Sequence, residues 1–327
     1  MPLVGMLCWP EGLLMAVRRQ ETVPALGRGG VRTFLNKASV RESLLAYAFM
    51  GPILVILLLL IAYPFLNAIY LSMTDKIVGY PPIFVGLQNY AELWESSQYR
   101  QVVYNSVVYT LGSVAIKLAL GMAMALVLNR ALKGRQFFRG ILLLPWIIPT
   151  VVIAITWRWL FDLFRGLINV SLIDLGLITS GIHWLGDPTL AMASVITANV
   201  WRGFPFFGVS LLAAMQVIPE ELYEAAEVDG ASAVQKFWHI TLPSIKGVLL
   251  VVTLLSTIWT LNDFNIVHIM TRGGPGTATH IFATFSYELG IQAQKWGQAV
   301  AASMYSLPAL ALLIILIARY LQQDEHE

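Results

Sequence analysis

The sequence is poor in charge and nearly devoid of cysteine. Only 12% of its 327 residues are Asp, Glu, Lys or Arg, and Cys8 is the single cysteine. A soluble protein of this length needs more charge to cover its surface, so the composition disfavours a soluble globular fold. One thiol also excludes a disulfide within the chain and any zinc site built from several thiolates.

Motifs of the common enzyme and nucleotide sites are absent as well. The chain contains no GxxxxGK[S/T] phosphate loop, no GxSxG nucleophile elbow and no HExxH motif, and its five histidines lack metal-ligand spacing. We therefore expect no enzyme activity, no bound metal and no cofactor in this chain itself. The formal net charge of +2 is too small to indicate nucleic acid as a partner.

What the chain does contain is apolar sequence in long runs. Hydrophobic residues make up 57% of it and the mean hydropathy is +0.69. A helix needs roughly 20 mostly apolar residues to cross a bilayer. Six segments meet this requirement, at about 46–72, 103–129, 140–162, 190–217, 247–270 and 298–320. Because membrane helices satisfy their own backbone hydrogen bonds, we predict an all-α membrane protein with six transmembrane helices.

The distribution of basic residues predicts the orientation. Thirteen Lys and Arg residues fall in the N-terminal tail, the loops 130–139 and 219–246 and the C-terminus, against five in the remaining loops. Basic residues concentrate on the cytoplasmic side of membrane proteins, so both termini are predicted to be cytoplasmic.

Three regions follow from these segments. Residues 1–42 are expected to form a disordered cytosolic extension, which is no signal peptide because Arg18 and Arg19 follow its first apolar run. Residues 43–102 hold the first span and an outer loop whose "FVGLQNYAEL" stretch predicts a short surface helix. Residues 103–322 form the core domain.

The loop 219–246 differs from the other loops in having strong helix signals. It reads PEELYEAAEVDGASAVQKFWHITLPSIK, in which Pro219 is a favourable first helical residue followed by acidic residues. Asp229 and Gly230 then interrupt the helical pattern, and Pro243 is expected to end a second short helix. The loop is therefore predicted to be a helix–turn–helix on the cytoplasmic surface.

The spacing of seven residues in this loop resembles the EAA signature of binding-protein-dependent ABC permeases. These residues are Glu224, Ala225, Ala226, Gly230, Ile240, Leu242 and Pro243. The resemblance implies an ABC type I importer permease fold whose loop docks in a cleft of an ATP-hydrolysing subunit. It further implies that Glu224 faces basic groups of that subunit and that Gly230 makes the turn.

Further stretches resemble the carbohydrate-uptake branch of this family, specifically the F-type permease of the maltose system. They are "NVWRGFPFF" (199–207), "LNDFNIVHIMTRGGPG" (261–276) and "VGLQNY" in the first outer loop. The resemblance implies a second homologous permease subunit, two ATP-binding subunits that hold ATP and Mg, and an extracytoplasmic solute-binding protein. It also implies a location in the cytoplasmic (inner) membrane of a bacterium or archaeon.

Polar residues in the fourth and fifth spans are the candidates for substrate contact, since polar groups inside a bilayer commonly mark a pathway. Seven residues of these two spans align with family positions that line a midmembrane sugar site: Asn199, Trp201, Gly203, Ser256, Trp259, Thr260 and Asp263. The same residues could instead join neighbouring helices. Arg202 and Asp263 could form a buried ion pair, and Lys117 could line the cavity, contact the partner permease or snorkel.

The resemblance implies a permease subunit that translocates a sugar, expected to be a di- or oligosaccharide, with ATPase subunits supplying the energy. One alternative is an ABC permease for glycerol-3-phosphate or a polyol, in which Arg202 would assist an anion. Another is an ion-coupled secondary carrier, which would leave the EAA spacing unexplained.

Overall fold

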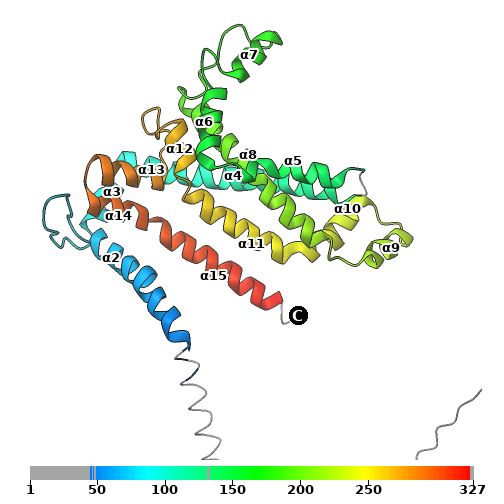
Figure 1. Ribbon diagram of the computed structural model, residues 1–327, viewed down its shortest axis with the longest axis horizontal. Coiled ribbons are helices and arrows are strands. Elements are labelled where there is room, and N and C mark those ends of the chain that lie inside the picture. The colour runs from blue at the N-terminus through cyan, green and yellow to red at the C-terminus, as the bar shows by residue number, and fades with distance from the viewer. Residues whose placement is uncertain (1–44, 46, 48, 131–132, 325–327) are drawn as a thin grey trace, which may run out of the picture. The chain divides into compact units, whose positions relative to one another are not determined.

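The computed structural model describes residues 45, 47, 49–130 and 133–324 (Figure 1). Its regular elements within these ranges are helices, and the only strand-like pairings there are the isolated bridges Thr74–Phe84 and Ile77–Lys295. The chain divides into two compact units, Met1–Pro64 and Phe65–Glu327. The predicted N-terminal extension, 1–42, lies outside the described residues.

Within the described ranges, five helices are long and apolar enough to cross a membrane. They are Phe49–Ser72, Ser97–Asn129, Pro188–Met215, Ala233–Met270 and Trp296–Gln322. These five correspond to the first, second, fourth, fifth and sixth predicted spans, with boundaries that differ by a few residues except at the start of the fifth. The helical character predicted from the apolar runs is therefore confirmed for these segments.

The third predicted span, 140–162, is not a continuous helix. It is divided between α5 (Arg135–Ile147) and α6 (Thr150–Leu160), whose axes differ in direction by 91°. Ile148 and Pro149 between them have ψ angles of 134°. A proline disfavours the helical conformation in the residue before it, and this explains the bend at Ile148. A total of six spans holds only if this pair counts as one.

Three long helices of the second unit form its centre: α4 (Ser97–Asn129), α8 (Pro188–Met215) and α11 (Leu242–Leu261), which lie side by side (Figure 1). Gly121 permits the close approach of α4 and α8, since a Cβ atom there would lie 2.3 Å from the Cβ of Phe207. Phe207 is fully buried in the same contact. Small residues bring membrane helices together in this way.

The remaining elements of this unit are shorter. α2 (Tyr63–Ser72) begins at the boundary between the units, after the π-helical segment η1 (Leu58–Ala62), and α3 (Gln88–Glu95) is the short helix predicted in the first outer loop. The others are α7 (Leu167–Asp174), α12 (Asn265–Met270), α13 (Phe282–Tyr287), the π-helical η3 (Glu288–Gln292), α14 (Trp296–Met304) and α15 (Ser306–Asp324).

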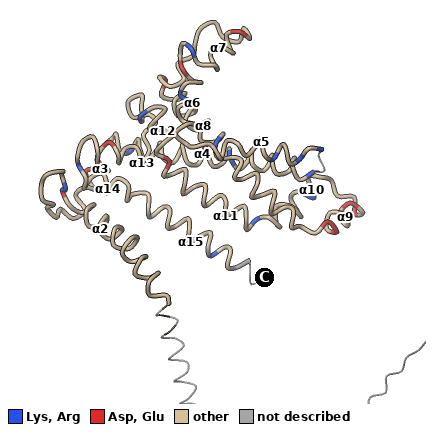
Figure 2. The backbone as a smooth tube through the Cα atoms, in the orientation of Figure 1, with Lys and Arg blue, Asp and Glu red and all other residues tan. Residues whose placement is uncertain are grey.

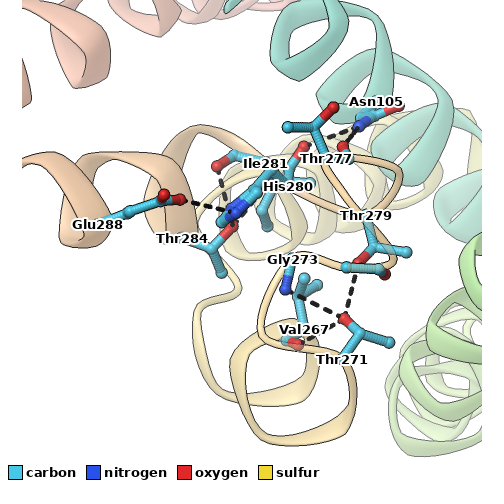
Figure 3. A network of polar contacts seen from close by, with 11 residues as sticks. Asn105, Val267, Thr271, Gly273, Thr277, Thr279, His280, Ile281, Thr284 and Glu288 are labelled. Atoms are coloured by element: carbon cyan, nitrogen blue, oxygen red, sulfur yellow. Dashed lines mark hydrogen bonds and ion pairs between the residues drawn. The ribbon is translucent and has the colours of Figure 1, made fainter. Parts of the chain in front are cut away.

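A polar network holds the loop that follows α12 (Figure 3). The Asn105 side-chain amide of α4 donates to the carbonyl oxygens of Thr277, at 2.7 Å, and His280, at 3.1 Å. The His280 Nε2 lies 2.8 Å from a carboxylate oxygen of Glu288. Burial lowers the pKa of His280, and the Glu288 carboxylate partly opposes that shift. Residues far apart in the sequence thus fasten the loop after α12 to α4.

Candidate functional site

The loop with the EAA spacing forms two helical segments joined by a glycine turn. α9 (Glu220–Val228) follows Pro219, and its first turn carries Glu220 and Glu221. Carboxylates at this position interact favourably with the positive end of the helix dipole. Gly230 has a φ of +77°, a backbone conformation that residues with a side chain rarely adopt. The helix–turn–helix predicted for the loop is therefore confirmed.

Side chains from the helical segments before and after Gly230 stabilise the turn. Ser232 caps α10 (Ala233–Lys236) by accepting from the backbone N–H of Gln235, whose side chain accepts in return from the Ser232 N–H. The Tyr223 and Thr241 hydroxyls hydrogen-bond at 2.9 Å. Glu227 and Lys236 form an exposed ion pair, and the hydrogen bond from Lys236 lowers the pKa of the Glu227 carboxyl.

Pro243 does not end the second helix, contrary to prediction. α10 continues through the π-helical segment η2 (Phe237–Thr241) directly into α11, with Pro243 in the first turn of α11. A proline cannot donate a backbone hydrogen bond, and the wider π turn just before it is a common way to accommodate such a break in the helical ladder. The loop is thereby joined without interruption to the fifth span.

The signature residues differ in exposure. Glu224, Ala225, Gly230 and Pro243 are exposed, whereas Ala226, Ile240 and Leu242 are half-buried. Large apolar side chains accompany them on the surface: Val228 is 89% exposed and Trp238 59%. Figure 2 shows acidic residues gathered at α9 beside them. An exposed apolar surface rimmed by charge is typical of a protein interaction site.

The second candidate site is a cavity of about 620 Å³ beside the bend between α5 and α6. Its lining residues come from α5, α6, α8, the end of α11, the break after it and the start of α12: Trp146, Thr150, Arg202, Ile258, Trp259, Asn262, Asp263, Phe264 and Asn265. A smaller pocket of about 60 Å³ adjoins it and shares Trp146, Arg202 and Trp259. The remaining lining of the smaller pocket is Lys117, Asn199, Gly203, Phe206, Ser256 and Thr260.

Helical register explains which of the predicted substrate residues meet here. Residues three, four and seven apart share one face of a helix. On α8 this face carries Asn199, Arg202, Gly203 and Phe206, and on α11 it carries Ser256, Trp259 and Thr260.

Trp201 lies outside both pockets. It is 36% exposed, and its ring lies 6.0 Å from that of Trp157 on α6, measured between centroids. The structure therefore brings six of the seven predicted residues together and separates Trp201 from them.

Asp263 lies at the break between α11 and α12 and is held by neutral donors. One of its carboxylate oxygens accepts from the Tyr109 hydroxyl at 2.9 Å and from the Asn199 amide at 2.6 Å. The other accepts from the backbone N–H of Ile266 at 3.4 Å. Within the described residues Arg202 forms no ion pair with Asp263, and its Nε atom is buried without a hydrogen-bond partner.

Lys117 of α4 lines the smaller pocket. Its side chain is almost fully buried, and its Nζ donates to the Thr260 hydroxyl at 2.9 Å. The stem passes over Gly203, where an added Cβ would lie 2.7 Å from the lysine Cε. Of the three alternatives for Lys117, the structure agrees with a lining position.

Several lining residues were not predicted from the sequence. Trp146 and Phe206 stack with centroids 6.1 Å apart, and Phe206 also lies 5.0 Å from the Trp259 ring. Asn262 and Asn265, polar residues of the fifth predicted span outside the seven aligned positions, add amide groups to the large cavity. The Ile148–Pro149 step is the sequence feature that could have indicated Trp146, because it ends α5 close to this residue and beside the cavity.

Among the described residues, no group of three or more His, Cys, Asp or Glu side chains gathers as a metal site would require. The chemistry of both candidate sites is therefore that of hydrogen bonds, charge and aromatic surface.

Comparison with known proteins bears directly on these two sites. The family model for the binding-protein-dependent transport system inner membrane component matches residues 117–324, which include the loop and most of the cavity. The chain belongs to this family. Members are transport permeases, so this permease is a non-enzymatic membrane component, as expected.

Two curated relatives and one solved structure resemble this permease over most of its length. A trehalose/maltose transport system permease protein (MalF) of Thermococcus litoralis is 38% identical over 78% of this chain and 87% of its own. A sulfoquinovosyl glycerol transport system permease protein (SmoG) of Agrobacterium fabrum is 33% identical over 81% and 87%.

The solved structure is a bacterial alginate ABC transporter in complex with an alginate pentasaccharide-bound periplasmic protein. It superposes with a TM-score of 0.73 at 23% identity, covering 86% of this chain and 94% of the other. This likeness shows the ABC importer permease fold.

Proposed function

We propose that this permease forms one half of a sugar-translocating pore in the inner membrane. The cavity carries the proposal, because it combines aromatic faces with planar hydrogen-bonding groups. Trp259 and Trp146 offer surfaces for the C–H faces of a sugar ring, and Asn199, Asn262 and Asp263 offer amide and carboxylate groups for its hydroxyls. The Asn199 side-chain oxygen is buried without a partner and is therefore available to a hydroxyl donor.

The relatives support a carbohydrate as the substrate. The Thermococcus relative is named for trehalose and maltose, and the Agrobacterium relative for a sugar-bearing glycerol. A cavity of about 620 Å³ in this chain alone has room for a disaccharide once a second permease encloses it. A di- or oligosaccharide is accordingly the proposed cargo.

The EAA loop is the proposed contact with the ATPase. Glu224 and its neighbours would dock in a cleft of an ATP-binding subunit, which holds ATP and Mg. Because η2 and α11 continue the loop without interruption, a displacement of α9 and α10 would be transmitted to Ser256, Trp259 and Thr260 at the other end of α11. A ligand-driven change needs two states that differ in their contacts, and closure of the ATPases would supply that difference.

The complete transporter would contain a second homologous permease, two ATP-binding subunits and an extracytoplasmic solute-binding protein. With both termini cytoplasmic, as the basic residues favour, the loop faces the ATPases and α3 and α13 face the binding protein.

The test compares two tryptophans in different places: Trp259 lines both pockets, and Trp201 lies outside them. In proteoliposomes holding the full transporter and its binding protein, Trp259→Ala should lower sugar uptake about thirtyfold, the loss that corresponds to the roughly 2 kcal/mol of an aromatic anchor in a pocket. Trp201→Ala should change it less than about twofold, because Trp201 lies outside both pockets.

The substrates for this test are polysaccharide hydrolysates of starch, glucomannan, alginate and pectin, separated by anion exchange into a neutral and an acidic fraction. Failure of both fractions to stimulate ATP hydrolysis by the transporter would overturn the sugar proposal. An equal loss in both tryptophan variants would overturn the assignment of the cavity.

A further inference from the structure

The charges lining the two pockets do not balance. The ionisable side chains there are Lys117, Arg202 and Asp263, two of them basic and one acidic. Asp263 already accepts hydrogen bonds from Tyr109 and Asn199 and does not pair with Arg202. Within the described part of the chain, the large cavity is lined by one group of each sign, Arg202 and Asp263, and the additional basic side chain, Lys117, lines the smaller pocket.

Among the described residues that line the two pockets, Arg202 is the cation without a hydrogen-bonded partner. Its Nε is buried and makes no hydrogen bond, whereas the Lys117 ammonium is anchored on the Thr260 hydroxyl. A charge within a membrane protein is costly unless another charge or a polar environment compensates it. The open side of the large cavity, which Arg202 lines, is the place where a compensating group can enter.

The groups around Arg202 fit an anion on a sugar. A guanidinium presents neighbouring N–H groups as a planar fork that matches the two oxygens of a carboxylate, sulfonate or phosphate. The Asn262 and Asn265 amides line the same cavity and can donate to the remaining oxygens, and Trp259 supplies a face for the ring. With a neutral sugar the guanidinium would gain no carboxylate, sulfonate or phosphate oxygens to pair with, since the Asp263 carboxylate accepts from Tyr109 and Asn199 instead.

We propose that this cavity takes an acidic carbohydrate, whose carboxylate, sulfonate or phosphate group pairs with Arg202. The inference rests on the proposed sugar transport and narrows its substrate class. Arg202 is the specificity-determining residue, and Lys117 adds positive potential from the smaller pocket without direct pairing.

The experiment measures ATP hydrolysis by the reconstituted transporter with its binding protein, stimulated by the neutral and acidic hydrolysate fractions described above. A matched pair, glucosyl glycerol and sulfoquinovosyl glycerol, differs essentially by one sulfonate and is tested alongside. The acidic members should reach half-maximal stimulation at a concentration at least about tenfold lower, the magnitude of one charge-assisted hydrogen bond.

Variants isolate the permease from the binding protein, which stays unchanged throughout. Arg202→Gln should remove the acidic preference, and Arg202→Lys, which keeps the charge and loses the fork, should retain part of it. Equal preference for neutral sugars in the native transporter, or an acidic preference that Arg202→Gln leaves intact, overturns the inference while sugar transport stands. Stimulation by neither fraction overturns the sugar proposal itself and the inference with it.

Discussion

The EAA loop and the cavity are built in opposite ways. The loop is contiguous in sequence, exposed, and held by contacts between residues at most 18 positions apart, such as Tyr223 and Thr241. The cavity is assembled from five helices, and the hydrogen bonds of its lining residues join positions as distant as Tyr109 and Asp263. A surface that must fit a partner is thus encoded locally, whereas a surface that must fit a cargo depends on how the helices pack.

The largest effect on coupling is expected from a substitution that disrupts the turn of the EAA loop and leaves the cavity unchanged. Gly230→Val places a β-branched residue at a φ of +77°, which costs about 1–2 kcal/mol in the turn. We expect sugar uptake per ATP hydrolysed to fall roughly tenfold, the population change that such a free energy produces. Uptake and ATP hydrolysis are measured together in proteoliposomes.

Gly230→Asn is the matched control, because asparagine tolerates the left-handed conformation better than other residues with a side chain. It should keep most of the coupling. Nothing lies within 4 Å of the Cβ position, so a steric clash cannot explain a difference between the two variants. Normal coupling in the valine variant would contradict the role of the turn.

A smaller effect is expected from a substitution in the smaller pocket. Gly203→Ala places a Cβ 2.7 Å from the Lys117 Cε, and the flexible lysine must shift away from Thr260 to accept it. Overpacking costs about 1–3 kcal/mol, and because the flexible lysine can move we expect the lower end of this range, a several-fold higher sugar concentration for half-maximal uptake. Coupling per sugar should stay unchanged, in contrast to the loop variants.

Gly112→Ala on α4 is the control for this substitution. Its Cβ would make an ordinary 3.5 Å contact with the Ile196 Cδ1, so it tests a helix glycine without the lysine. An effect as large as that of Gly203→Ala would show that general helix packing, and not the pocket, is responsible.

The smallest effect concerns the exposed ion pair of the loop. Lys236→Ala removes the partner of Glu227, and we expect less than about a twofold change in uptake because exposed pairs contribute little. The pKa of Glu227 is lowered from 4.5, so the pair stabilises the loop above that pH and its contribution is lost as the pH falls below it. Amide hydrogen exchange across 229–236, compared at neutral pH and near pH 3, measures this in native and variant protein.

Protection is compared between native and Lys236→Ala protein at the same pH, and a difference at neutral pH that persists unchanged near pH 3 would contradict the assignment. The two remaining features of the turn, Gly230 and the Ser232 capping box, do not titrate and serve as an internal reference.

Local sequence signals predicted the loop well. Acidic residues after Pro219, the Asp229–Gly230 step and the EAA spacing each refer to neighbours within one or two helical turns, and the structure has the expected two helices. The failure was Pro243, which sequence rules treat as a helix end. A π turn absorbs it, and no composition signal distinguishes that outcome from a break.

Apolar length predicted five continuous spans but failed at the third. Hydropathy depends on composition alone and is insensitive to a 91° change of direction. The proline at 149 carried the information, yet prolines also occur inside membrane helices, as Pro205 does in α8. Whether a proline bends a helix depends on the packing that re-satisfies the freed backbone groups.

By itself, the sequence determined that the chain is a helical membrane protein with an EAA loop, because apolar length, helix signals and turn glycines act over short distances. Only the tertiary structure decided that Asp263 accepts from Tyr109 and Asn199, that Lys117 crosses Gly203, and that Trp201 lies apart from the other candidates. Those outcomes depend on the mutual rotation and approach of α4, α8 and α11, which arise from packing between residues distant in the chain.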